Sequence, residues 1–211
     1  GGNTLTVGND ATQNAAYAGG ITGSGIFRLN GNGSFQTLAA TDNSAQTWST
    51  EVANGLLNVA SNAQLGSGSV TLGIAGVSGA DDFTGLNLQS TAAFVNNIVV
   101  ANVNSVGSAS ITASGADAVV SGTVTLNRNI YAGAAAGTQL SLDGTVGGNG
   151  TITVIDGGAL RLTGANSYGA GVADTSGTPF QGGTVVRAGS VLLENNAAAG
   201  LNKIVLGDAA S

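Results

Sequence analysis

The chain has 211 residues, of which 36 are glycine, and only 8% of its residues are charged. This charged share is about a third of the share found in ordinary soluble domains. Eleven acidic residues outnumber five Lys and Arg residues, and the net charge is −6. A surface with so few cations neutralises few phosphates, so we expect no nucleic-acid partner.

Two residue types with catalytic and metal-binding roles, Cys and His, are absent from the sequence. Their absence excludes nucleophilic catalysis by Ser–His or Cys–His pairs, and it excludes the common zinc sites. No apolar run approaches the roughly eighteen residues of a membrane helix, so we expect no membrane span in this segment. Because the chain opens with Gly1 rather than with Met and a signal peptide, we interpret it as a processed product or an internal segment.

Glycine occurs about once in every six residues, and each occurrence costs a helix roughly 1 kcal/mol. Instead of helical periodicity, the chain repeats a short pattern in which apolar residues alternate with small polar ones and Gly, Asn or Asp follows. In chain order, this pattern occupies residues 4–8, 69–73, 122–127, 139–144, 151–157, 158–162 and 189–193. Residues 86–106 are rich in β-branched side chains and also predict strands. A period of two gives each strand one buried and one solvated face, so the sequence predicts an all-β protein.

Short strands of this kind can form a β-sandwich or a closed barrel. Most connections, however, are loose runs of Ala, Gly, Ser and Asn with irregular lengths. A β-solenoid explains the thin aliphatic core, because its interior is a narrow column and its corners favour Gly and Asn, which tolerate φ > 0. We therefore predict one continuous parallel β-helix over residues 1–211, with about ten coils of about twenty residues and a rise of about 50 Å.

Two segments resemble a known repeat family. Residues 158–168 read Gly-Ala-Leu-Arg-Leu-Thr-Gly-Ala-Asn-Ser-Tyr, and residues 182–193 read Gly-Gly-Thr-Val-Val-Arg-Ala-Gly-Ser-Val-Leu-Leu. Together they resemble the autotransporter-associated β-strand repeat, and residues 55–73 resemble it more weakly. The resemblance implies a single-stranded right-handed parallel β-helix on the surface of a Gram-negative bacterium, in a stalk or fibre, with no catalytic residue in the motif. Between the two segments, residues 169–181 hold the only proline, Pro179, and we predict a loop inserted at one corner.

Most acidic residues stand in turn contexts, where Asp side chains bond the backbone two residues on. These residues include Asp10, Asp42, Asp143, Asp156 and Asp208. The glycine-rich calcium-binding nonapeptide is absent, and scattered carboxylates rarely supply the six to eight oxygens of a calcium site. We therefore predict no metal site, no cofactor and no catalytic residue, with calcium binding as the alternative.

The adjacent pair Asp81 and Asp82 raises the alternative of a β-helical polysaccharide lyase or hydrolase. A glycosidase needs two carboxylates that face each other across a sugar bond, whereas neighbours on a strand point to opposite faces. We therefore predict that this pair lies in a solvated loop. The enzyme alternative would need other carboxylates to meet through coiling, with Arg residues as substrate clamps.

For three further features, the sequence favours a structural role over a binding or catalytic site. Arg28 and Arg161 each stand between two apolar residues of a predicted strand, so both should point outward as solubilising charges. We predict that Trp48 packs inside a wide corner, with an exposed sugar-stacking platform as the alternative. Thr-x-Thr triplets raise an ice-binding or carbohydrate-binding alternative, although their spacing is irregular. The triplets begin at Thr4, Thr123 and Thr151.

The first and last predicted rungs, residues 3–7 and 203–206, carry no legible capping helix and no proline. Unpaired backbone groups at such ends should bind another rung. We predict either continuation in a longer chain or end-to-end stacking of separate copies into a filament. The sequence as a whole predicts an extracellular, non-enzymatic structural or adhesive solenoid, similar to an autotransporter passenger stalk, with surface glycans as a further possible class of partner.

Overall fold

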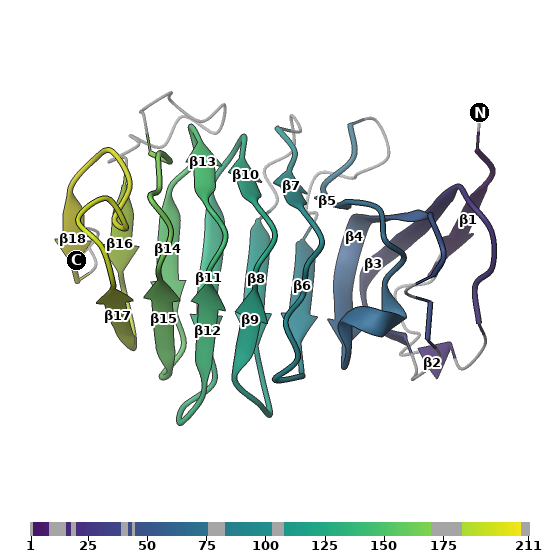
Figure 1. Ribbon diagram of the computed structural model, residues 1–211, viewed down its shortest axis with the longest axis horizontal. Coiled ribbons are helices and arrows are strands. Elements are labelled where there is room, and N and C mark those ends of the chain that lie inside the picture. The colour runs from purple at the N-terminus through teal and green to yellow at the C-terminus, as the bar shows by residue number, and fades with distance from the viewer. Residues whose placement is uncertain are drawn as a thin grey trace.

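The chain forms a parallel β-solenoid whose turns stack along one axis (Figure 1). The computed structural model describes residues 2–8, 16–17, 20–38, 42–43, 45–75, 83–102, 108–169 and 183–207, with the backbone alone at 16–17 and 32–38. All ladders between the described strands are parallel. The predicted solenoid is confirmed, and the sandwich and barrel alternatives are wrong.

The strands lie on three faces of the solenoid, which we number 1 to 3, and not every turn has a strand on each face. Face 1 consists of β1 (Thr4–Val7), the first parts of β3 (Ile26–Leu38) and β4 (Ser49–Val59), β5 (Val70–Leu72), β7 (Ile98–Val100), β10 (Val124–Leu126) and β13 (Val146–Gly148). Face 2 consists of β2 (Ala16–Tyr17), the later parts of β3 and β4, β6 (Thr84–Leu88), β8 (Ala109–Ala113), β11 (Ile130–Ala134), β14 (Ile152–Ile155), β16 (Thr184–Val186) and β18 (Ile204–Leu206). Face 3 consists of β9 (Ala118–Val120), β12 (Gln139–Leu142), β15 (Ala159–Leu162) and β17 (Ser190–Leu193).

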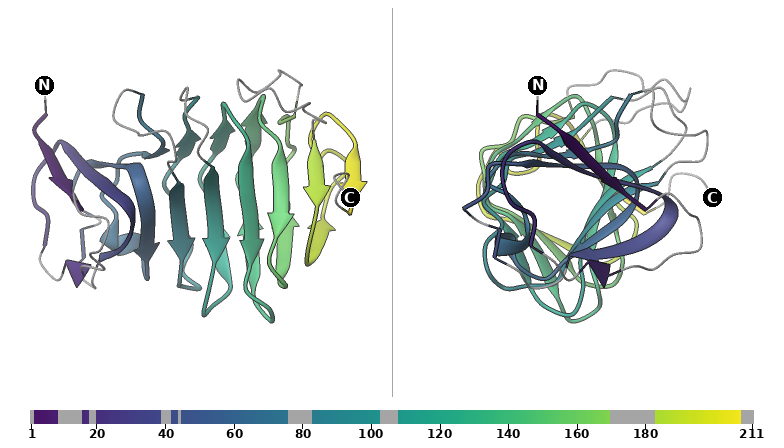
Figure 2. Two further views of the ribbon diagram at one scale, coloured as in Figure 1. Left: turned by 180° about the vertical axis from the view of Figure 1, so that it is seen from behind. Right: turned by 90° about the vertical axis from the view of Figure 1, so that its right-hand side faces the viewer.

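Faces 1 and 2 belong to one fourteen-stranded sheet, because β3 and β4 run around the corner between them, whereas face 3 is a separate four-stranded sheet. Figure 2 shows the solenoid from behind and along its axis. Among the described residues, the helical element is one 3₁₀ turn, η1 (Asn62–Gln64), whose first turn is capped by the Ser61 side chain. The low helix content expected from the glycine spacing is therefore confirmed.

The solenoid has about seven turns, so the prediction of about ten coils is wrong. The prediction assumed twenty residues in every turn. The register shows turns that range from 20 residues, between Thr50 and Val70, to 32 residues, between Ile152 and Thr184. Longer corners use more of the chain for the same rise, so seven turns give about 34 Å at about 4.8 Å per turn. The predicted loop at 169–181 falls within the longest turn, but beyond Gly169 it lies outside the described residues.

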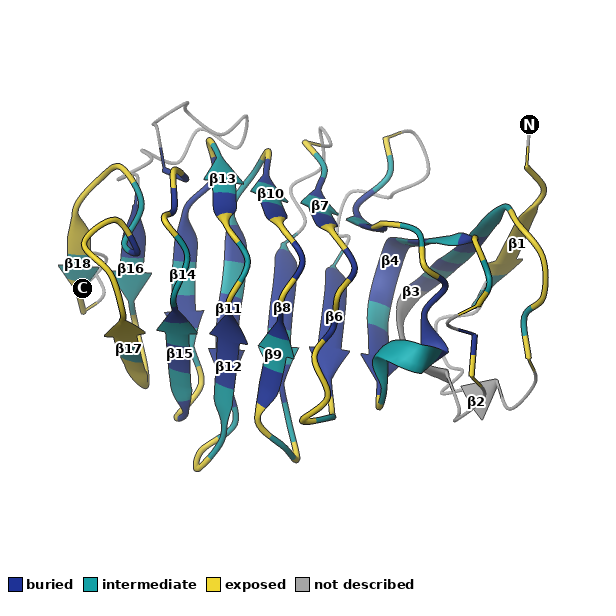
Figure 3. Cartoon of the chain, viewed as in Figure 1, coloured by how far each residue is buried: buried dark blue, intermediate teal, exposed yellow. Residues whose placement is uncertain are grey.

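The core is a continuous column of aliphatic side chains, as the alternating pattern predicts. On each face the register places one inward residue directly above another, and the members of these rows are almost fully buried (Figure 3). The row on face 1 is Leu29, Val52, Leu72, Val100 and Leu126. The row on face 2 is Leu57, Leu86, Ile111, Ala132 and Val154. Burial of such side chains contributes roughly 1.5–3 kcal/mol each, so this column is the main source of stability.

Asparagine side chains at the corners bond the backbone of a neighbouring turn. Buried Asn96 donates from Nδ2 to the carbonyl oxygens of Gly66 and Gly68, both at 2.7 Å. Asn166 accepts from the Val146 amide at 2.7 Å and donates to Ala198 O at 2.7 Å. We expected Asn at corners because it tolerates positive φ, but Asp156 (φ 67°) is the one non-glycine residue with positive φ in the described part. Asn stands at these corners because its amide spans the gap between turns.

One corner consists of stacked glycines. A Cβ on Gly122 would overlap the carbonyl oxygen of Asn96, and a Cβ on Gly144 would overlap that of Gly122. The next turn places Gly164 over Gly144 in the same way. The backbones of successive turns therefore approach too closely at this corner for any side chain.

Candidate functional site

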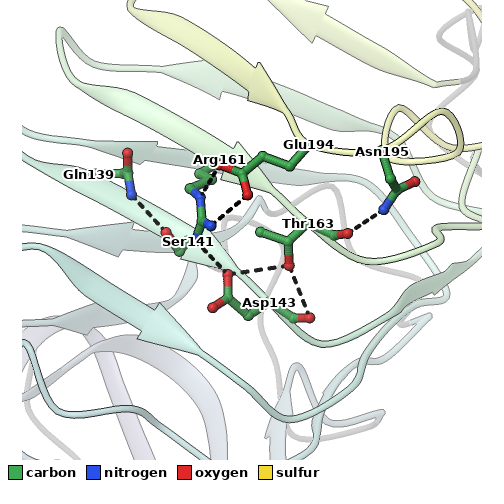
Figure 4. Close-up of polar contacts among 7 residues, drawn as sticks. All are labelled: Gln139, Ser141, Asp143, Arg161, Thr163, Glu194 and Asn195. Atoms are coloured by element: carbon green, nitrogen blue, oxygen red, sulfur yellow. Dashed lines mark hydrogen bonds and ion pairs between the residues drawn. The ribbon is translucent and has the colours of Figure 1, made fainter.

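The most concentrated charged cluster in the described part of the chain lies on the outer surface of face 3. Arg161 is in the middle of β15, where Leu160 and Leu162 are buried and Arg161 points outward, as predicted. Asp143 follows the strand of the preceding turn, and Glu194 follows the strand of the next turn. We call these three residues the Arg161 clasp, because they connect three consecutive turns (Figure 4).

The Arg161 guanidinium fills the space between the two carboxylates. It donates from Nε to Glu194 Oε1 at 2.7 Å and from Nη2 to Glu194 Oε2 at 2.6 Å. It also donates from Nη1 to Asp143 Oδ1 at 3.1 Å. Two parallel bonds to one carboxylate are the geometry in which Arg binds most specifically.

Neutral polar groups extend the clasp on both sides. Thr163 donates from Oγ1 to the Asp143 carbonyl oxygen at 3.2 Å, and Asn195 donates from Nδ2 to the Thr163 carbonyl oxygen. Gln139 donates from Nε2 to Ser141 Oγ at 2.8 Å, next to Arg161. Most of these contacts run between turns and therefore along the solenoid axis, as the dashed lines in Figure 4 show.

The ion pairs shift the protonation equilibria of the clasp. The hydrogen bond from Arg161 lowers the pKa of the Glu194 carboxyl below its ordinary value, and the positive charge acts in the same direction. The same hydrogen bond to Glu194 raises the pKa of Arg161, with smaller contributions from the charges of Glu194 and Asp143. Both shifts favour the charged forms of Arg161 and Glu194, so the ion pair between them is maintained at neutral pH.

The geometry of the clasp suits structure more than catalysis. A substrate clamp needs a guanidinium that is available to a substrate carboxylate, whereas Arg161 already binds two carboxylates of its own chain. A glycosidase pair needs two carboxylates separated by a sugar bond, whereas Asp143 and Glu194 both accept from one guanidinium. What the arrangement can do is hold three turns in register.

A third ion pair lies on face 1 and interrupts the threonine pattern there. Arg28 donates from Nε to Glu51 Oε2 at 2.7 Å, which confirms its outward orientation. The register aligns the outer residues of face 1 in one row, which is Thr6, Arg28, Glu51, Thr71, Val99 and Thr125. Thr153 lies on face 2. The three Thr-x-Thr triplets therefore do not form one flat array on the described surface.

Trp48 packs in the core, as predicted, and does not form an exposed sugar platform. Its side chain is 2% exposed, and its ring lies 5.7 Å from that of Phe27 between centroids. Next to it, at the N-terminal end of the solenoid, is a hollow of about 380 Å³. Its walls include Leu5, Ile21 and Ile26 as well as both aromatic rings. The Trp48 Nε1 is buried and has no hydrogen-bond partner.

The two ends of the solenoid expose residues that the middle turns bury. On β18, Ile204 is 40% exposed and Leu206 is 79% exposed, whereas residues in the same inward rows of inner strands are buried. At the other end, Leu5 of β1 is 44% exposed although its partner Phe27 is 1% exposed. Figure 3 shows this contrast between buried inner strands and exposed end strands. The ends are therefore the second candidate site of this molecule.

The acidic residues that were predicted to lie in turns or loops differ in where the structure places them. Asp143 lies beside its predicted turn but also joins the clasp, and exposed Asp156 adopts the left-handed conformation of a turn. Asp10, Asp81, Asp82 and Asp208 lie outside the described residues. Within the described ranges, no three side chains of the His, Cys, Asp or Glu type are grouped to hold a metal ion, and no helix is long and apolar enough to cross a membrane.

Sequence reasoning missed the clasp, the corner amides and the N-terminal hollow. Arg161 is 18 residues from Asp143 and 33 from Glu194, so only the register brings them together. Aligning Leu142 with Leu162 in the repeated pattern would have revealed the proximity of Asp143 to the Arg161 turn.

Comparisons with protein-family models, with curated proteins and with solved structures give no match for this chain. The resemblance of residues 158–168 and 182–193 to the autotransporter-associated repeat therefore stays a prediction.

Proposed function

We propose that this chain is a non-catalytic structural rod that serves as a stalk or spacer in an extracellular assembly. The proposal rests on the direction of the backbone hydrogen bonds between strands. The backbone ladders of all three faces run along the same axis, and they surround one hydrophobic core cluster whose members extend from Phe27 to Ala198. Such a chain can be lengthened by repeating its turns without changing its cross-section.

The polar side chains support the same role, because most of their contacts join consecutive turns. Asn96 and Asn166 bond backbone groups of neighbouring turns, and Asn87 donates to Asn58 Oδ1 at 2.7 Å. Both ion-pair groups, at Arg28 and at Arg161, also bridge turns. Side chains are thus used to hold the stack together on its outside as well as in its core.

Location on the surface of a Gram-negative bacterium is part of this proposal. Its support is the repeat-like sequence of residues 158–168 and 182–193 and the low charge without cysteine. The outer row of face 1 presents Thr6, Thr71 and Thr125, whose hydroxyl groups could contact surface glycans in an adhesive role.

Two measurements test the proposal. Incubation with acidic and neutral polysaccharides, with and without calcium, should leave every polysaccharide intact. Cleavage by the wild-type chain that the heat-denatured chain lacks would overturn the non-catalytic role. Treatment of intact source cells with a protease should remove the folded protein from the cells, whereas protection until the cells are lysed would overturn the surface location.

A further inference from the structure

The end strands of the solenoid have unpaired backbone edges. On β1, the Ile26 amide donates to Asn3 O at 2.9 Å, so Asn3 and Leu5 bond to β3. In a parallel ladder, residues that bond one neighbour alternate with residues that face the other side. Thr4 and Thr6 therefore direct their N–H and C=O groups away from the stack.

The same argument identifies the opposite edge. On β18, Lys203 O accepts from Thr184, and the Gly207 amide donates to Val186 O at 2.9 Å. Ile204 and Leu206, which lie between these positions, therefore direct their backbone groups away from β16. Val191 and Leu193 do so on β17, because Ser190 and Glu194 bond to the turn of β15.

The described strands at the two edges lack the features that block association. Natural edge strands are protected by charged residues, by proline or by bulges. The sequences of β1, β17 and β18 are Thr-Leu-Thr-Val, Ser-Val-Leu-Leu and Ile-Val-Leu, with no charge and no proline. None of the residues that line the N-terminal hollow is charged, so Lys203 beside β18 meets no like charge there.

Apolar side chains are exposed at one end of the solenoid and line a hollow at the other. The C-terminal end exposes the aliphatic side chains of Leu193, Leu201, Ile204 and Leu206. The N-terminal end has the hollow of about 380 Å³, with Leu5, Ile21 and Phe27 in its wall. Strand addition between proteins uses exposed apolar side chains next to an unpaired strand edge, and both are present here.

We infer that the C-terminal end of one copy docks on the N-terminal end of a second copy, so that the solenoid continues across the contact. This inference rests on the proposed structural role and adds the partner. The exposed aliphatic side chains of the C-terminal end cover the hollow, and the outward backbone groups of Thr4 and Thr6 on β1 bond to the last turn of the other copy. Because the two surfaces differ, the contact is heterologous and repeats into an open filament.

Sedimentation velocity of the 211-residue chain over a range of concentrations tests this inference. The wild-type chain should form species larger than a dimer as concentration rises. Leu206→Asp should abolish growth without changing the melting temperature, because Leu206 is 79% exposed in the single chain. The matched control is Val95→Asp. Val95 is also exposed, at 62%, but it lies at neither end of the solenoid, so this variant should assemble as the wild type does.

Mixing two variants that block opposite ends tests the head-to-tail direction. Leu5→Asp places a charge in the hollow and leaves the C-terminal end intact, and Thr6→Pro is a second variant that blocks the β1 edge without removing a ladder donor. Each variant alone should be monomeric, and Leu5→Asp mixed with Leu206→Asp should form dimers and nothing larger. Dimers of Leu5→Asp alone would indicate a tail-to-tail contact and overturn the inference, as would a wild-type chain that is monomeric at every concentration. A monomeric wild type that also cleaves no polysaccharide would overturn the filament and leave the structural role intact.

Discussion

Tyr168 and Thr184 meet inside the solenoid, where the phenol oxygen lies 2.6 Å from Thr184 Oγ1 and both side chains are fully buried. Burial raises the pKa of Tyr168 from 10.0 to about 12, against a smaller opposite effect of the hydrogen bond with Thr184. The buried hydroxyl thus gives the fold a measurable dependence on alkaline pH.

The first prediction concerns this phenol. Between pH 10.0 and about 12 the unfolded chain loses the Tyr168 proton while the folded chain keeps it. The stabilisation is therefore complete below pH 10.0 and is lost as pH rises through the pKa of the folded state. Urea unfolding across this range should show the wild type losing about 3 kcal/mol more than Tyr168→Phe. Parallel losses in the two proteins would contradict the assignment.

The second prediction concerns the Arg161 clasp. Because the pKa of Glu194 is lowered in the folded state, its contribution is present above the ordinary value of 4.5 and is lost as pH falls through the lower, folded value. The wild type should therefore melt at a higher temperature than Glu194→Gln at neutral pH, by a small margin that added salt reduces. At pH values well below 4.5 the two melting temperatures should converge. A margin that stays constant from neutral to acid pH would show that Glu194 does not act through its charge.

The third prediction concerns the corner amide of Asn96. Asn96→Ala leaves the carbonyl oxygens of Gly66 and Gly68 without their donor in a buried corner. We expect the free energy of unfolding to fall by about 1–3 kcal/mol in chemical denaturation. The control Asn149→Ala changes an exposed residue and should alter stability by less than about 0.5 kcal/mol. Equal effects of the two changes would refute a special role for the corner amide.

The fourth prediction concerns the glycine corner. Gly144→Ala forces its Cβ against the carbonyl oxygen of Gly122, so adjacent turns must separate. This overpacking should destabilise the chain by about 1–3 kcal/mol, measured by urea unfolding. Gly147→Ala is the matched control, because its Cβ would meet only Ser167 Oγ, at 3.3 Å. Should Gly144→Ala prove as stable as this control, the close approach of the turns at this corner would be disproved.

The fold class was predictable because the alternation of apolar and polar residues is a local property. Leu160 and Leu162 are buried and Arg161 is outward, as the period of two requires, and the pattern at 139–144 contains β12. The number of turns was not predictable, because corner length varies from turn to turn without changing the strand pattern. The clasp was not predictable for a related reason, since Asp143 and Glu194 meet Arg161 only once the register between turns is known.

The orientation of the hydrogen bonds along the solenoid axis determines how the rod would respond to force. A pull on its two ends loads the ladder bonds in the direction in which they break, and the end turn yields first because it is paired on one side only. Detachment would then proceed from an end, one turn after another, and each released turn of 20 to 32 residues would lengthen the tether before the next one yields. A rod of this kind dissipates a sudden load in steps instead of failing at once.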